Sequence, residues 1–234
     1  MNENKKDFKN MILGFGVITL YLVASLSSLN ILSIFNINYN NFSLLGKAIY
    51  AITYEALLTL IIIFIYRKDF IPDLKIFVKN NAKYFKKYIK YWFLVIILMI
   101  LSNGIVTMFT NTDTAANQEI IVNTLKKAPI YIFITTVFIA PILEELVFRL
   151  SFKKIFAHTN FLFILFSGFI FGSMHVIGSL NNITDILFII PYSIPGFIFA
   201  YTYTKSENIC VPISLHFIHN GVSMCLQIIL TFLI

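Results

Sequence analysis

The stretch PIYIFITTVFIAPILEELVFRL, residues 129–150, shows most directly what kind of chain this is. Its length matches the roughly 20 apolar residues that a helix needs to cross a hydrocarbon core. Near its end stand Glu144, Glu145 and Arg149. Each charged side chain in such a span costs about 2.5–3.5 kcal/mol on insertion scales, so three together require partners or a task. The sequence therefore predicts a membrane helix that carries a functional site.

The remainder of the chain is similarly apolar. Of its 234 residues, 58% are hydrophobic and only 12% are charged, and the mean hydropathy is +0.82. This composition leaves too little polar surface to cover a water-soluble globule. We therefore predict an all-α polytopic membrane bundle of about seven transmembrane helices. The expected spans are residues 11–35, 48–66, 91–110, 129–150, 160–178, 183–203 and 209–233.

The net charge of +7 is distributed in a way that orients the chain. With a cytoplasmic N-terminus, 14 of the 18 Lys and Arg residues fall in cytoplasmic segments, whereas Lys47, Lys126 and Lys127 fall outside. Cytoplasmic loops of membrane proteins carry such an excess. The charge therefore indicates orientation in a lipid bilayer and gives no reason to expect a nucleic-acid partner. We expect a multi-pass protein of the cell membrane with a cytoplasmic N-terminus.

Two connectors divide the chain. Residues 68–90 (KDFIPDLKIFVKNNAKYFKKYIK) are basic, and their aromatic and apolar residues recur at near-helical spacing. We expect an amphipathic cytoplasmic connector on the membrane surface, which binds anionic headgroups or docks a substrate. The polar connector 111–127 then separates three spans from four. The predicted parts are N-terminal membrane helices with the basic connector in residues 1–127, and a catalytic helical core in residues 128–234.

The two adjacent carboxylates are predicted to have different roles. Glu145 and Arg149 are four residues apart, so they share a helix face and can form a pair that lowers the cost of burying both. Glu144 is rotated by about 100° from Glu145 and is left without that partner. Burial then suits Glu144 to act as a general base. A charge cluster that merely joins helices is the structural alternative.

Two further motifs place imidazoles in apolar spans. In FGSMH, residues 171–175, His175 lies over Phe171 and is either a packing residue or a group that helps to deprotonate a water. In HFIHN, residues 216–220, His216 and Asn220 share a face. Their donors suit a developing oxyanion. For Asn220, a hydrogen bond between helices is the alternative.

A bound metal is the competing functional arrangement. Glu144 or Glu145, together with His175 and His216, could supply three ligands and an open water position for zinc. No HExxH motif is present. The preferred interpretation therefore requires no cofactor, and zinc remains the alternative.

Positions along the helices give a rough test of whether these groups can meet. Counted from the cytoplasmic helix ends, Glu144 lies about 10–13 Å deep, His216 about 10 Å and His175 about 20 Å. A gap that persisted would remove His175 from the site. Glu55, near the middle of the second span, has no partner close in the sequence. Its role and that of His219 are left open.

Together the three motifs resemble the CPBP family of intramembrane endopeptidases, which comprises CAAX prenyl proteases and bacteriocin-processing (Abi) proteins. The signature of that family is EExxxR, then FxxxH, then HxxxN or HxxxD, on successive membrane helices. Residues 144–149, 171–175 and 216–220 satisfy all three. The resemblance covers residues 127–231. Each motif is short, but their order within apolar helices is specific.

The resemblance implies a role for each motif. Glu144 and His175 would activate the attacking water, His216 and Asn220 would stabilise the oxyanion, and the remaining charged pair would support the site. Family members are often called metallopeptidases, although a glutamate-activated water without metal is also argued for them. The candidate catalytic residues are Glu144, Glu145, Arg149, His175, His216 and Asn220.

Two positions depart from the family pattern without removing a catalytic group. Leu150 follows Arg149 where many members have Gly, and His219 is an additional imidazole.

The expected function is cleavage of a lipidated or membrane-embedded peptide near the cytoplasmic face. Richness in Ile, Asn and Lys favours a peptide pheromone, a bacteriocin precursor or another membrane peptide over a prenylated protein. A non-catalytic membrane partner, such as a bacteriocin-immunity or sensor-regulating protein, is the alternative. A transporter is less consistent with the sequence, because the first three spans hold no inverted counterpart of the motif helices.

Overall fold

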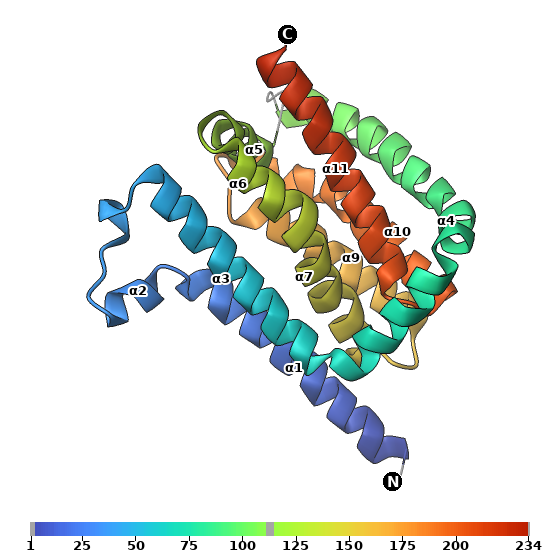
Figure 1. Cartoon of the computed structure of the whole chain (residues 1–234). Helices are drawn as coiled ribbons and strands as arrows, with labels where there is room; N and C mark the ends of the chain where they lie inside the picture. Colours follow the sequence, from blue (N-terminus) through green and yellow to red (C-terminus); the bar gives the residue numbers. More distant parts are fainter. Residues whose placement is uncertain (1–2, 111–114, 234) are drawn as a thin grey trace.

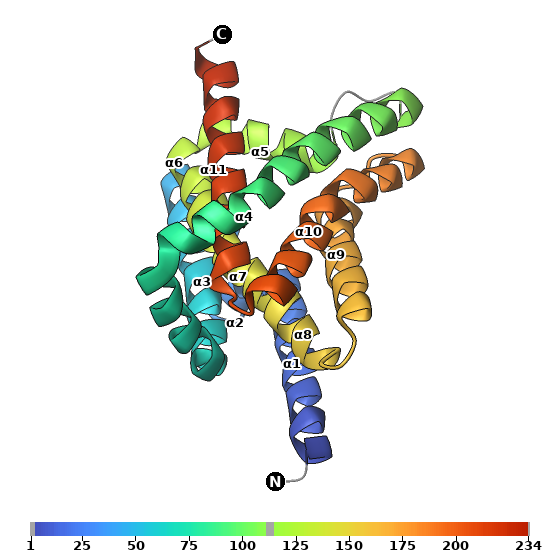
Figure 2. The same ribbon diagram turned by 90° about the vertical axis from the view of Figure 1, so that its right-hand side faces the viewer.

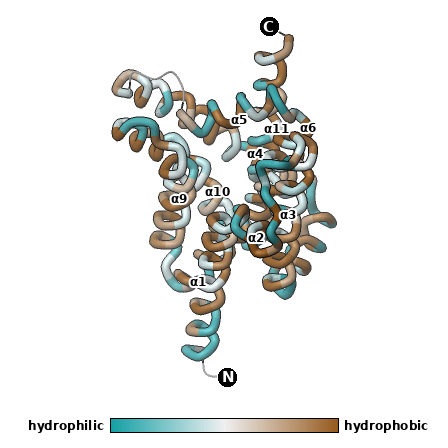
Figure 3. The backbone as a smooth tube through the Cα atoms, turned by 90° about the vertical axis from the view of Figure 1, so that its left-hand side faces the viewer, coloured by the Kyte–Doolittle hydropathy of each residue, from teal (hydrophilic) through white to brown (hydrophobic). Residues whose placement is uncertain are grey.

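The computed structural model describes residues 3–110 and 115–233, and these residues form helices and turns without a strand. Seven of the helices are long and apolar enough to cross a membrane. Large apolar side chains also face outward, as at Phe64 (64% exposed) and Ile100 (66% exposed). Apolar residues, brown in Figure 3, follow most of the helices. These observations confirm an all-α, multi-pass membrane bundle.

The chain alternates between the two ends of this bundle, and its termini lie at opposite ends (Figure 1). An odd number of spans has this consequence. The helices are α1 (Glu3–Ser27), α2 (Asn30–Ile34), η1 (Tyr39–Asn41), α3 (Leu44–Ile65), α4 (Arg67–Thr110), α5 (Ala116–Lys127), α6 (Pro129–Phe133), η2 (Ile134–Ile139), α7 (Ala140–Glu145), η3 (Leu146–Ser151), α8 (Phe152–Ile155), α9 (Asn160–Ile177), η4 (Ile183–Phe188), α10 (Ile189–Ser206) and α11 (Cys210–Phe232).

The first expected span, residues 11–35, is wrong at both ends. The spanning helix runs from Asn4 to Ser27, and the apolar residues that follow form the short α2 and a turn. Asn36 has a left-handed backbone with φ of 55°, a conformation that ends a helix. The Ser28 carbonyl accepts a hydrogen bond from the Tyr50 hydroxyl of α3. The apolar run therefore continues past the point at which the helix ends.

The basic connector and the third span form one helix, α4. The predicted helical spacing of the connector is confirmed, but no loop separates it from the span. Only Asn80 departs from helical geometry, with φ of −123° and ψ of 17°, and it marks a kink. The later polar connector contains the helix α5, while its residues 111–114 lie outside the described part of the chain.

The span that carries the two glutamates occupies the centre of the bundle. All six residues of η3 are buried, and Leu146, Val147 and Phe148 belong to the largest hydrophobic core. Two π-helical segments, η2 and η3, stand on either side of α7. Such wider turns change the direction in which successive side chains point and are frequent at functional sites. The glutamates at the end of α7 therefore lie between two local changes of helical register.

Helices α9 and α10 approach each other through glycines (Figure 2). A Cβ on Gly196 would lie 2.6 Å from the carbonyl oxygen and 2.7 Å from the Cα of Gly168. A Cβ on Gly172 would lie 2.6 Å from the backbone nitrogen of Ser193. Small residues four apart are typical of close helix packing in membranes. This contact fixes α10 against the helix that carries His175.

Three polar contacts tie four segments together at the N-terminal end of the bundle. Asp7 of α1 pairs with His158 at 2.9 Å, and Lys154 of α8 pairs with Asp69 of α4 at 3.0 Å. Asp73, also in α4, accepts a hydrogen bond of 2.8 Å from the backbone nitrogen of Ile209, before α11. The start of α4 and the turns after α8 and α10 therefore share one side of the bundle with the chain start.

The contact between α9 and α10 predicts the effect of an added methyl group. We expect Gly196→Ala to destabilise the protein by about 1–3 kcal/mol, because its Cβ would meet backbone that no side-chain rotation can clear. Thermal unfolding in detergent micelles measures this change as a lower midpoint. Gly104→Ala is the control, because nothing lies within 4 Å of its Cβ position. Equal midpoints for the two variants would contradict the described packing.

Candidate active site

A cavity of about 890 Å³ lies inside the bundle and brings the candidate residues together. Its lining includes Glu144, His175, His216 and Asn220 from three different spans. Residues of α1, α3, α4 and α5 complete the walls. Glu145 and Arg149 lie behind the wall, with side chains that are fully buried. The structure thus brings all six candidate residues into one neighbourhood.

The Glu144 carboxylate faces two imidazoles. Its Oε2 atom is 3.9 Å from Nε2 of His175 and 3.8 Å from Nε2 of His216. These separations exceed a direct hydrogen bond and suit a bridging water. The Oε2 atom is buried and has no hydrogen-bond partner in the part of the chain that the structure describes. A polar oxygen of this kind requires a partner from the cavity.

His175 therefore meets Glu144, although the residue counts placed the two at different depths. The helices are not all parallel, and α10, which packs against α9, runs obliquely to α11 (Figure 2). Distance along one helix consequently does not equal depth relative to another. No gap separates His175 from Glu144, so His175 stays among the candidate site residues.

The ring orientation of His175 is fixed by its own helix. Its Nδ1 atom is 2.8 Å from the carbonyl oxygen of Phe171, so Nδ1 donates and Nε2 keeps its lone pair in the neutral ring. The imidazole lies 4.5 Å from the ring of Phe171 and stacks at 5.5 Å on Tyr192 of α10. The nitrogen that faces Glu144 is therefore an acceptor.

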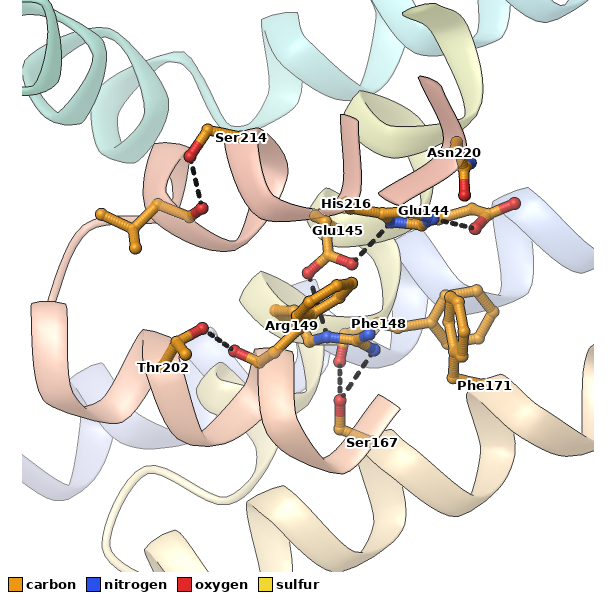
Figure 4. Close-up of polar contacts among 12 residues, drawn as sticks. Glu144, Glu145, Phe148, Arg149, Ser167, Phe171, Thr202, Ser214, His216 and Asn220 are labelled. Carbon is orange, nitrogen blue, oxygen red and sulfur yellow. Dashed lines mark hydrogen bonds and ion pairs between the residues drawn. The ribbon is translucent and has the colours of Figure 1, made fainter. Parts of the chain in front are cut away.

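Arg149, Glu145 and His216 form a continuous row of buried charged and polar groups (Figure 4). Nε of Arg149 is 3.0 Å from Oε2 of Glu145, and Oε1 of the same carboxylate is 3.0 Å from Nδ1 of His216. The predicted pairing of Glu145 with Arg149 is confirmed. Because Glu145 accepts from Nδ1, the opposite nitrogen of His216 points toward Glu144.

The guanidinium of Arg149 has two further supports. Its Nη1 atom donates to the hydroxyl of Ser167 at 3.2 Å, and that hydroxyl donates to the carbonyl of Phe148 at 2.6 Å. Its carbon atom lies 4.6 Å from the centre of the Phe171 ring, a cation–π distance. Sequence reasoning missed Ser167, and a small polar residue next to Gly168 in an apolar helix was its only signal.

Asn220 uses part of its amide to join helices. Its Nδ2 atom donates to the carbonyl of Thr136 in η2 at 2.9 Å. An amide nitrogen carries two hydrogens, so a second donor is left. The residue also lines the cavity. The two alternatives for Asn220, a bond between helices and a donor to the site, are therefore compatible.

The zinc alternative was tested against the arrangement of ligands. Among residues 3–110 and 115–233, no group of three His, Cys, Asp or Glu side chains is arranged to hold a metal ion. Glu145 is engaged by Arg149 and His216. We therefore derive no step through a metal.

These features define a polytopic membrane protein with a buried glutamate–histidine cluster that opens onto an internal cavity. Residues 126–222 match the sequence model of the family described as type II CAAX prenyl endopeptidase Rce1-like. This match bears out the resemblance drawn from the three motifs. All six candidate residues fall inside the matched segment.

Three curated relatives extend the comparison. YdiL of Bacillus subtilis (strain 168), which carries a membrane-peptidase name, is 32% identical over 114 residues, 48% of this chain and 43% of that protein. MroQ of Staphylococcus aureus (strain USA300), named a membrane-embedded CAAX protease, is 30% identical over 158 residues, 62% and 60% of the two chains. UPF0177 protein YvdC of Lactococcus lactis subsp. lactis (strain IL1403) is 27% identical over 196 residues, 82% and 70%.

The chain spans less than two thirds of the length of YdiL and of MroQ. No solved structure matches it significantly.

The buried row predicts a measurable coupling. We expect Arg149→Met to destabilise the protein by about 3–5 kcal/mol, because it leaves the Glu145 carboxylate buried without its cation. Combining it with Glu145→Gln should restore much of the lost stability, since the double variant buries no uncompensated charge. Unfolding in mixed micelles with increasing denaturing detergent measures both. Additive losses in the double variant would contradict the pairing.

Proposed function

We propose that this protein is an intramembrane endopeptidase that hydrolyses a peptide bond in a lipidated or membrane-embedded peptide. The observation that carries the proposal is the position of the Glu144 carboxylate. Its Oε2 atom is buried, has no hydrogen-bond partner among the described residues and faces two imidazole nitrogens across gaps that suit water. The family match and the names of the relatives support the same activity.

The first chemical step uses Glu144 and His175. A water held between Oε2 of Glu144 and Nε2 of His175 gives a proton to the carboxylate while its oxygen attacks the peptide carbonyl carbon. The lone pair of His175 accepts a hydrogen bond from the other proton of the water and orients the attacking oxygen. Because the surrounding helices are largely apolar, both interactions are stronger than they would be in solution.

The tetrahedral intermediate places negative charge on the former carbonyl oxygen. Nε2 of His216 and the second amide hydrogen of Asn220 are the donors that stabilise this oxyanion. Nε2 of His216 can donate while Nδ1 donates to Glu145 only when both ring nitrogens carry a hydrogen. Arg149 pairs with Glu145 and holds it in place. The proton on Glu144 then passes to the leaving amine as the C–N bond breaks.

We further propose that the N-terminus is cytoplasmic, with the lipid bilayer around the spans. The segments that share the N-terminal side of the bundle contain most of the Lys and Arg residues. This arrangement agrees with the charge excess of cytoplasmic loops. The peptide then reaches the cavity from within the membrane or from its cytoplasmic face.

Replacing the proposed base tests the function. We expect Glu144→Gln to lower the cleavage rate by at least about 10²–10⁴-fold, because the amide cannot accept the proton but keeps the shape of the carboxylate. Incubation of purified protein in liposomes with prenylated and unlipidated peptides, followed by mass spectrometry of the products, measures the rate.

Glu119→Gln is the matched control for this variant. Glu119 is an exposed carboxylate of α5 that does not line the cavity, so its replacement should leave cleavage unchanged. Both variants should insert into membranes and unfold at the same temperature as the natural protein. Full cleavage by Glu144→Gln would exclude Glu144 as the base.

Chelation separates the proposed mechanism from its metal-dependent alternative. We expect the cleavage rate to be unchanged by EDTA or 1,10-phenanthroline, since Glu144 and His175 suffice to activate the water. A loss of activity that added zinc restores would require a metal in the cavity instead.

A further inference from the structure

Glu55 is a carboxylate of the cavity that the proposed mechanism does not use. It lies near the middle of α3 and lines the same cavity as Glu144. Its side chain forms no hydrogen bond or ion pair with any residue in the described part of the chain. An ionisable group in the middle of a membrane span is costly and requires compensation. The compensating group for Glu55 must come from what occupies the cavity.

Other carboxylates in the spanning helices are compensated by the protein. Glu145 has Arg149 and His216. Asp185 accepts from the backbone nitrogens of Asn181 and Asn182, each at 2.9 Å. Asp73 accepts from the backbone nitrogen of Ile209. Glu55 differs from all of these, so packing or capping does not account for it.

The electrostatics of the cavity favour a positive occupant. Among the described residues, its lining contains the carboxylates of Glu55 and Glu144, the imidazoles of His175, His216 and His219, and no Lys or Arg. The two carboxylates line one cavity, so their negative charges disfavour each other. A cation between or beside them relieves this repulsion, and among apolar walls the gain exceeds that at a surface.

Aromatic rings near Glu55 strengthen the same preference. Tyr21, Tyr54 and Tyr131 line the cavity with it. The hydroxyl of Tyr54 donates to the carbonyl of Ala24 at 2.7 Å, which holds its ring in place. The faces of aromatic rings attract ammonium and guanidinium groups. A carboxylate surrounded by tyrosines therefore binds an organic cation in preference to a neutral side chain.

We propose that Glu55 determines specificity by binding a positively charged group of the peptide, either a Lys or Arg side chain or a free amino terminus. That the bound molecule is a peptide rests on the proposed function. The new claim is that this peptide carries a positive charge that Glu55 binds. The ammonium or guanidinium group donates to the Glu55 carboxylate while the scissile bond lies at Glu144. Apolar neighbours on the peptide contact the remaining lining.

Binding measurements test this site without requiring cleavage. The Glu144→Gln variant, in which Glu55 is the remaining carboxylate among the described residues that line the cavity, is titrated in bicelles with fluorescent apolar peptides. One set has an acetylated amino terminus and a single lysine, placed in turn at each position. A second set has norleucine in place of lysine, and a third has norleucine with a free amino terminus.

We expect at least one cationic peptide to bind about ten- to hundredfold more tightly than its norleucine counterpart, as for a charge-assisted hydrogen bond. Adding Glu55→Gln should abolish this difference, whereas adding Glu119→Gln should preserve it. Comparison of the first and third peptide sets shows whether the site binds a lysine side chain or a free amino terminus. Equal binding of cationic and neutral peptides, a preference that survives Glu55→Gln, or no measurable binding would overturn the proposal.

Cleavage by the natural protein, measured in parallel, separates this inference from the proposed function. A charge preference that depends on Glu55 without any cleavage would retain the site and contradict the peptidase. Cleavage that is indifferent to peptide charge in both the natural protein and Glu55→Gln would retain the peptidase and contradict the site.

Discussion

The burial of charge in an apolar bundle is the constraint on which the site depends. Arg149 and Glu145 are fully buried, so neither can leave its partner without exposing an uncompensated charge to the interior. The second oxygen of Glu145 engages His216, which joins the central span to α11. Once this row is formed, the far nitrogen of His216 can only face Glu144. The ion pair thus positions the groups that touch the cavity.

Close backbone packing and π-helical turns also position the site residues, in addition to the buried ion pair. The glycine contact between α9 and α10 lets the two helices approach closely enough for His175 to stack on Tyr192. The π-helical segments on either side of α7 change the helical register before and after the two glutamates. Residues without any reactive group therefore help to bring the imidazole of His175 toward the Glu144 carboxylate.

Local patterns in the sequence predicted the local features well. The spacing of Glu145 and Arg149 was sufficient for their pairing, and apolar length was sufficient for the number of spans. Local patterns cannot predict how helices cross one another. For this reason the depth of His175 relative to Glu144 could not be predicted from the sequence. The end of α1 at Ser27 and the direct continuation of the connector into the third span, through the kink at Asn80, were missed because hydropathy does not mark where a helix stops. Gly168 and Gly172 form a GxxxG pattern, a signal of close helix packing that the sequence analysis did not use.

The two parts of the chain contribute differently to one cavity. The matched segment, residues 126–222, contains the row of buried charges, Glu144 and His175. Glu55 stands on α3, outside that segment, yet lines the same space. Hydrolysis requires a fixed geometry, whereas recognition must follow whatever peptide is present. On the proposals above, the C-terminal helices carry the reaction and the N-terminal helices select the substrate, so variation in α1, α3 and α4 can change the peptide without disturbing the water.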